Sequence, residues 1–156
     1  MKDFGMVNHI VPITAPVQKT ATFVTPHVKL SKFERVLFLV LFGAIATDGF
    51  VLTVTASADN AGGTPTALSF KYRLTAAAGT DTLGALSAAV SSLDCVHDGA
   101  FDNAVVMIEV DADELTADKP YVGLTFTDPG SADAVIGVVA QLKPRYPQAT
   151  NDGALT

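Results

Sequence analysis

One stretch of the chain, residues 36–54, combines an almost unbroken apolar run with a turn signal inside it. A membrane-spanning helix needs about 20 apolar residues without charge, but Asp48 lies within this run, where an unpaired carboxylate is costly in a bilayer. Asp48-Gly49 between apolar segments favours a hairpin turn, because glycine reaches positive φ without a Cβ clash. After the turn the side chains alternate with the period of two that is typical of a strand. We therefore interpret the run as two core strands joined in a hairpin.

Composition indicates a single domain that belongs to an assembly. The chain has 156 residues, enough for one well-filled core and short for two. Charged residues make up 17%, below the roughly 25% of an average soluble chain. This low charge suggests that neighbouring subunits cover part of the surface.

The charges are unevenly distributed along the chain. Residues 1–35 carry five basic and two acidic side chains, although the whole chain has a net charge of −6. A basic, extended segment on an acidic body can bind an acidic partner or a neighbour in an oligomer, or it can be a solvated loop. The basic residues are few and dispersed, which argues against nucleic-acid binding.

The remaining pattern predicts an all-β chain. Pro12, Pro16 and Pro26 exclude a helix before residue 32, and we interpret residues 1–32 as an extended N-terminal arm with one or two strands. Residues 83–90 are ambiguous between a short helical turn and a loop. The residues after 147 are polar, and we expect a loose tail over 148–156. Core strands are expected at about 35–44, 49–58, 66–75, 104–111, 119–127 and 133–142. Such regular spacing is typical of a β-sandwich, a jelly roll or a barrel, and we place that single β-sandwich domain at residues 33–147.

Residues that could carry chemistry are few. Cys95 is the only cysteine, so no disulfide framework exists, and Cys95 with His97 gives two potential metal ligands where a site needs at least three. Acidic residues gather at Asp94, Asp98, Asp102, Asp111, Asp113 and Glu114. Aspartate is common in turns because it hydrogen-bonds its own backbone, so we interpret this group as turn residues rather than as catalysts. We expect no enzymatic activity, no cofactor and no bound metal.

Two segments carry a resemblance to a known family. Residues 35–49 (RVLFLVLFGAIATDG), followed by 50–58 and Asp59-Asn60, resemble small virion proteins of tailed bacteriophages. Residues 119–127 (KPYVGLTFT), 134–142 and the ending Lys143-Pro-Arg-Tyr-Pro147 resemble the carboxy-terminal hairpin of those proteins. The resemblance implies a jelly-roll-like fold and a head decoration (cement) protein, a homotrimer that binds the major capsid protein on the outer surface of the virion.

A decoration protein needs a rigid body, a self-association surface and a segment that bridges capsid subunits, and many weak contacts then add together. We expect the arm to supply the partner-binding residues, which are Ile10, Lys19, Phe23, Val24, Lys29 and Lys32. The N-terminus shows no signal-peptide pattern, so assembly is expected in a host cytoplasm without membrane attachment. One alternative is a phage tail or head–tail connector protein. Another, of a different class, is a carbohydrate-binding β-sandwich module, which the absence of Trp disfavours.

Overall fold

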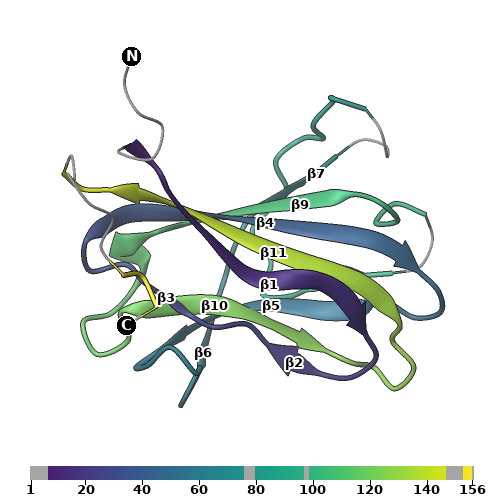
Figure 1. Cartoon of the computed structure of the whole chain (residues 1–156), viewed down its shortest axis with the longest axis horizontal. Coiled ribbons are helices and arrows are strands. Elements are labelled where there is room, and N and C mark those ends of the chain that lie inside the picture. The colour runs from purple at the N-terminus through teal and green to yellow at the C-terminus, as the bar shows by residue number, and fades with distance from the viewer. Residues whose placement is uncertain (1–6, 76–79, 97–98, 147–152, 156) are drawn as a thin grey trace.

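The chain is all-β, as expected, and its strands form two antiparallel sheets that pack face to face (Figure 1). The computed structural model describes residues 7–75, 80–96, 99–146 and 153–155. Within these ranges the strands are β1 His9–Lys19, β2 Phe23–Val24, β3 Val28–Lys29, β4 Phe33–Ile45, β5 Phe50–Ser57, β6 Thr66–Leu68, β7 Tyr72–Leu74, β8 Leu93–Cys95, β9 Val105–Asp111, β10 Tyr121–Thr127 and β11 Ala134–Pro144. A single 3₁₀ turn, η1 (Ala112–Glu114), follows β9, where a turn was predicted.

The strand order defines a jelly roll. The first sheet (sheet A) has the order β1-β11-β4-β9-β7, and the second (sheet B) has the order β2-β10-β5-β6, with β3 also paired to β10 and β8 to β5. The pairs are nested along the chain: β1 with β11, β2 with β10, β4 with β9 and β5 with β6, alternating between the sheets. A long hairpin folded over on itself produces this order, which is the eight-strand jelly-roll arrangement.

The predicted hairpin over residues 36–54 is wrong, although both of its strands exist. Strand β4 pairs with β11 and β9 in sheet A, whereas β5 pairs with β10, β6 and β8 in sheet B. The turn between them therefore crosses from one sheet to the other. Gly49 does not have the positive φ that a hairpin turn would require. It is needed for close approach, because a Cβ there would lie 1.3 Å from the carbonyl oxygen of Cys95.

The carboxy-terminal hairpin that the resemblance implied is also a crossing between sheets. Strand β10 lies in sheet B and β11 lies in sheet A. A local turn signal predicts that the chain reverses, but it does not say whether the second strand pairs with the first or packs above it. The sandwich arrangement is preferred here because both strands of each predicted hairpin carry an apolar face that packing between the sheets buries.

Three crossings between the sheets meet at one end of the sandwich and are hydrogen-bonded to one another. They are residues 20–22, 46–49 and 128–133. The backbone carbonyl of Asp133 accepts a hydrogen bond from the amide of Ala46 at 2.8 Å, and the amide of Asp133 donates to the carbonyl of Asp48 at 3.2 Å. The amide of Asp128 donates to Thr22 Oγ1 at 2.9 Å. These bonds satisfy backbone groups that the sheets leave unpaired and fix the crossings relative to one another.

The core lies between the two sheets and is filled by every second residue of the long strands. Phe38, Val40, Leu52, Leu124 and Ile136 are fully buried there. An aromatic group forms near the crossing end, where the Phe23 and Phe126 rings stack at 4.6 Å. Burial of each such side chain contributes about 1.5–3 kcal/mol to stability.

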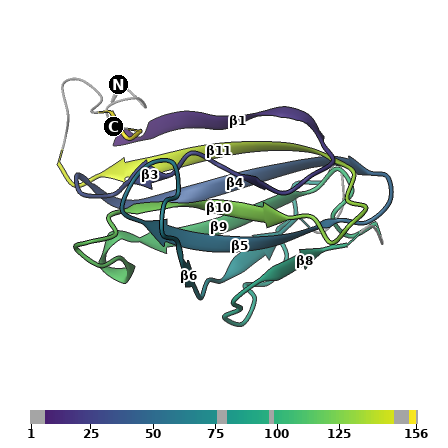
Figure 2. The same cartoon turned by 90° about the horizontal axis from the view of Figure 1, so that it is seen from below.

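The separate arm over residues 1–32 is wrong for the described residues 9–29, which supply three strands to the sandwich. Strand β1 pairs with β11 along its length, from His9 opposite Leu142 to Lys19 opposite Ala134. It lies at the margin of sheet A in both views (Figures 1 and 2). Strands β2 and β3 pair with β10. Val11, Ile13 and Val28 are buried in the common core. The segment is extended because of its prolines, as predicted. Its alternating apolar side chains, such as Val11 and Ile13, pack into the core and make it part of the sandwich.

The expected loose tail over 148–156 does not hold for residues 153–155. The carbonyl of Ala154 accepts a hydrogen bond from the amide of Lys29 at 2.7 Å, and Ala154 is buried. Asn60 donates its side-chain amide to the carbonyl of Leu155 at 2.6 Å. The end of the chain is thus held against β3 and the loop that follows β5.

Candidate interaction surface

The six residues predicted to bind a partner lie along one side of the sandwich, where β1, β2 and β3 form sheet margins. Ile10 in β1 and Val24 in β2 are about half exposed. Lys32 lies on the surface just before β4. These three side chains are placed where a partner could reach them.

The other three predicted residues, Lys19, Phe23 and Lys29, contact aromatic rings of the body. Phe23 stacks on Phe126 and meets Phe50 edge to face at 5.9 Å. The ammonium of Lys19 lies 4.7 Å from the centre of the Phe23 ring, and that of Lys29 lies 5.3 Å from the Tyr121 ring. Cation–π contacts of this kind hold the lysines against the body. The charged groups of Lys19 and Lys29 still lie at the surface. Phe23, in contrast, packs at the margin of the core and is not part of a docking surface.

Beneath this side of the sandwich lies a buried histidine that no sequence pattern pointed out. Nδ1 of His27 is 3.0 Å from the carbonyl of Thr25, and Nε2 is 3.0 Å from Thr55 Oγ1. Since a carbonyl can only accept, Nδ1 carries the proton and Nε2 accepts from the threonine hydroxyl. Burial lowers the pKa of His27 from its ordinary 6.5. Gly123 leaves room for the ring, because a Cβ there would lie 2.5 Å from Nδ1.

Cys95 lies in β8 inside the core, and its neighbour in the proposed pair, His97, lies outside the described residues. Burial raises the pKa of the Cys95 thiol to about 12. Because the thiolate is the nucleophile and the metal ligand, this environment disfavours both roles. Among the described residues no group of three or more His, Cys, Asp or Glu side chains is arranged to hold a metal ion.

Several acidic side chains accept hydrogen bonds from backbone amides. Asp102 Oδ1 accepts from the amide of Ile45 at 2.9 Å, and Glu114 Oε2 accepts from the amide of Asp111 at 3.1 Å. Asp128 Oδ1 accepts from Gly130 and Ala132 at 2.7 and 2.9 Å, and these backbone bonds lower its pKa. These carboxylates hold turns, which agrees with the interpretation of Asp102 and Glu114 as turn residues, whereas the Asp111 carboxylate pairs with Arg35.

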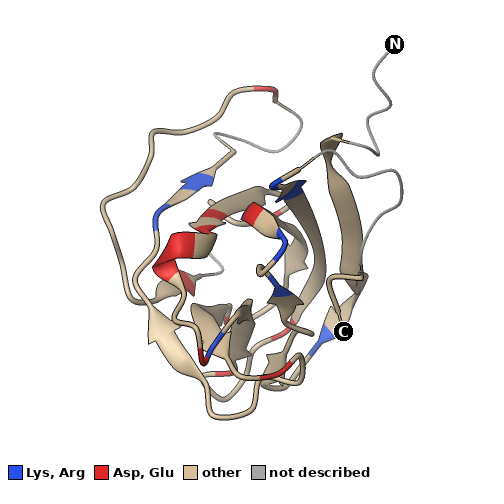
Figure 3. Cartoon of the chain, turned by 90° about the vertical axis from the view of Figure 1, so that its left-hand side faces the viewer, with Lys and Arg blue, Asp and Glu red and all other residues tan. Residues whose placement is uncertain are grey.

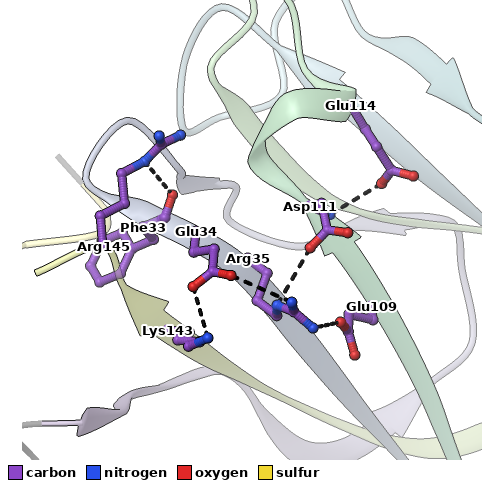
Figure 4. A network of polar contacts seen from close by, with 8 residues as sticks. All are labelled: Phe33, Glu34, Arg35, Glu109, Asp111, Glu114, Lys143 and Arg145. Carbon is purple, nitrogen blue, oxygen red and sulfur yellow. Dashed lines mark hydrogen bonds and ion pairs between the residues drawn. The ribbon is translucent and has the colours of Figure 1, made fainter.

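Charged side chains form a paired cluster at the end of the sandwich opposite the crossings (Figures 3 and 4). Arg35 forms ion pairs with Glu109, with Asp111 at 3.4 Å and with Glu34 at 3.5 Å. Lys143 Nζ lies 2.8 Å from the Glu34 carboxylate, and this hydrogen bond lowers the pKa of Glu34. Glu109 is the main cause of the raised pKa of Arg35, and Asp111 adds to it. Each charged group of this cluster has an oppositely charged partner within the chain.

The structure also shows a surface that the sequence analysis missed, on the outer face of sheet A. Within the run 36–42, alternate residues point inward, and Leu37, Leu39 and Leu41 point outward. Neighbouring strands place further aliphatic side chains beside them by register. We call this surface the aliphatic face, and its members are Leu37, Leu39, Leu41, Val105, Met107 and Val139. The sequence signal for this surface was an apolar run in which polar residues do not alternate with apolar ones, because such a run makes both faces of a strand apolar.

A shallow hollow extends the aliphatic face towards the end of β7. Its volume is about 640 Å³, and Leu37 and Met107 line it together with Leu86 and Ala89. Charged side chains complete the lining: Lys71, Arg73, Glu109, Asp111 and Glu114. Leu86 and Ala89 come from the segment 83–90, which is not a helix. That segment runs beside β7 through bridges between Thr75 and Leu83 and between Phe70 and Val90.

Comparison with known proteins gives a likeness of fold. No family model matches the sequence, and no curated protein matches it. The structure is similar to the crystal structure of the SPBc2 prophage-derived protein YomS, with 15% identity, a TM-score of 0.49, and coverage of 87% of this chain and 94% of that one. A likeness at this identity and score leaves the function of the chain open. Within its described part the chain contains no helix with the length and apolarity of a membrane span.

Proposed function

We propose that this chain is a phage head decoration protein that binds the major capsid protein lattice as a homo-oligomer, on the outer surface of the virion. The proposal starts from the sequence resemblance of residues 35–60 and 119–147 to small virion proteins. The resemblance implied a jelly-roll-like fold, and the nested strand pairs supply one. The resemblance further implies a homotrimer.

One observation supports the proposal most: the sandwich carries an aliphatic exterior face. The outer face of an exposed antiparallel sheet is ordinarily polar, and a contiguous apolar patch marks a surface that another molecule covers. Leu41 on this face is 41% exposed. A structural protein that functions by binding neighbouring subunits requires such a surface, whereas an enzyme requires a cleft with activated groups.

We assign the capsid contact to the side formed by β1 and β2, where Ile10, Val24 and Lys32 are exposed. Both strands are sheet margins, so one edge of each has backbone groups that face away from its sheet. An extended segment of a capsid subunit could add to either margin by β-augmentation, with the exposed aliphatic residues supplying apolar contact.

Co-sedimentation of the purified chain with capsid shells tests the assignment. The wild type should co-sediment and saturate, and Val24→Asp should weaken binding at least tenfold. Ala67→Asp is the matched control, because Ala67 is exposed in β6 at the opposite margin of sheet B and should bind like the wild type. Wild-type protein that stays in the supernatant at every shell concentration would contradict the proposal.

The carbohydrate-binding alternative has less support in the structure. Sugar-binding modules present several exposed aromatic rings on one face, but Phe70 is buried and Tyr72 packs against the core, and the exposed Tyr146 follows the last strand. A glycan array with the same protein preparation separates the two readings, since a decoration protein should give no specific hits.

A further inference from the structure

Three segments that are remote in the sequence meet at the margin of sheet B, and we call this place the His27 junction. They are residues 25–29, which contain β3, the loop 59–63 that follows β5, and residues 153–155 near the end of the chain. The amide of His27 donates to the carbonyl of Asn60 at 2.8 Å, and the side-chain amide of Asn60 donates to the carbonyl of Leu155 at 2.6 Å. The amide of Lys29 donates to the carbonyl of Ala154 at 2.7 Å, and the end of the chain lies beside β3 in both views (Figures 1 and 2). A displacement of His27 therefore disturbs the loop and the end of the chain together.

The ring of His27 is enclosed at the centre of the junction and is fully buried. Thr55 of β5 and Gly123 of β10 lie opposite each other by register, and the ring packs against both. From the loop, Gly62 approaches the ring so closely that a Cβ there would lie 2.9 Å from Cε1. The ring is thus held between sheet B on one side and the loop 59–63 on another.

The surroundings of the ring suit the neutral imidazole. Its two nitrogens donate to the Thr25 carbonyl and accept from the Thr55 hydroxyl, so both are satisfied without a charge. Burial lowers the pKa of His27, and this effect outweighs the hydrogen bond to Thr25 and the negative charge of Asp59, which both act to raise the pKa. A second proton would place a cation in a site without water, which is costly unless the cation is paired.

The charged and titratable side chains around the ring are few and have other contacts. Asp59 in the loop accepts the amides of Ala61 and Gly63 at Oδ1, each at 2.9 Å. On its own segment, the ammonium of Lys29 lies over the ring of Tyr121 from β10. From β5 the ring meets a threonine, and the described residues at the end of the chain are Gly, Ala and Leu. A protonated His27 would therefore gain most by reaching water.

We propose that the His27 junction is a pH-sensitive switch, in which protonation of the buried ring opens the junction and releases residues 153–155 from β3 while the two sheets stay paired. The hydrogen bonds that must break lie outside the ladders of the long strands. Release leaves the amide of Lys29 without its acceptor at the margin of sheet B, where an extended segment of a partner can add. The inference does not depend on a capsid or on the proposed function.

Linkage gives the sign and the size of the effect. In the open junction the ring is hydrated and should titrate near its ordinary pKa of 6.5, above that of the closed junction. The closed junction is therefore favoured above pH 6.5 and loses this advantage as the pH falls. Between pH 7.5 and pH 5.5 the equilibrium constant for opening should rise by up to about tenfold.

Amide hydrogen exchange of the full chain, followed by NMR at pH 7.5 and pH 5.5 and corrected for the intrinsic rates, tests the proposal. The protection factor of the Lys29 amide should fall by about threefold to tenfold at the lower pH. The Gly84 amide is the matched control, because it donates to the carbonyl of Leu74 at 2.8 Å in the other sheet and should keep its protection. His27→Gln cannot titrate, so the protection of Lys29 in this variant should be the same at both pH values.

A second measurement, on the wild type, keeps the proposal testable if His27→Gln fails to fold. The imidazole of His27, titrated by NMR, should have its midpoint below pH 6.5. A midpoint at or above 6.5, unchanged protection of Lys29, an equal fall at Gly84, or an equal fall in His27→Gln would each overturn the inference. None of these measurements involves capsid shells, so their failure is distinct from failure of the proposed function.

Discussion

Deletion of residues 2–28 should abolish cooperative folding, because this segment supplies strands to both sheets. It contains Val11 and Ile13, each 8% exposed, and Val28, which is fully buried, so the deletion removes all three of these core side chains. At about 1.5–3 kcal/mol for each buried side chain, loss of the three contributions amounts to roughly 5–9 kcal/mol. The whole stability of a domain is about 5–15 kcal/mol, so little or none would remain.

Urea unfolding followed by far-UV circular dichroism measures the effect. The truncated chain should show no cooperative transition, whereas Ile10→Ser, at a half-exposed position of the same segment, should change the free energy of unfolding by less than about 0.5 kcal/mol. A truncated chain that unfolds cooperatively would refute the reasoning and would restore residues 1–32 as an arm.

Three further predictions follow from buried groups and from the two faces of β4. Because the pKa of His27 is lowered in the folded state, the unfolded chain binds protons more readily, and stability should fall as pH drops below about 6.5. The urea midpoint should therefore be lower at pH 5.5 than at pH 7.5. His27→Gln should reduce this difference. Cys95, with a pKa raised to about 12, should react with a thiol reagent only in denaturant, so labelling of the native protein within minutes would contradict its burial. Phe42→Asp should unfold the domain, because a charge in the core is costly unless paired, whereas the adjacent Leu41→Asp should remain folded; equal thermal stability of the two variants would show that the faces are misassigned.

The sequence predicted local conformation better than pairing. Alternation and proline placement located most strands of the two sheets, and a turn was expected where η1 forms. The pairing of β4 with β9 and β11 depends on residues far along the chain, and no local signal at Asp48-Gly49 distinguishes a hairpin from a crossing between sheets. The strand β1 was recognised in part, but its membership of the body depended on a partner more than 100 residues away.

The exposure of the candidate residues was predictable only in part. Ile10, Val24 and Lys32 are exposed, as a partner-binding role requires, because polar and proline-rich segments lie at sheet margins. Phe23 could not be assigned from sequence, since its stacking on Phe126 joins two segments that are remote in the chain. The aliphatic face was overlooked because residues 36–42 were interpreted only as a core strand. The structure shows that sheet A is covered on one face by sheet B and that Leu37, Leu39 and Leu41 lie on the other face.

The most direct test of the central claim is the copy number of this chain in purified virions relative to the major capsid protein, measured by quantitative mass spectrometry. A decoration protein should be present in a fixed and simple ratio to the capsid subunit, and the ratio should be the same in heads separated from their tails. Absence from the particle, or presence only in the tail fraction, would contradict the account.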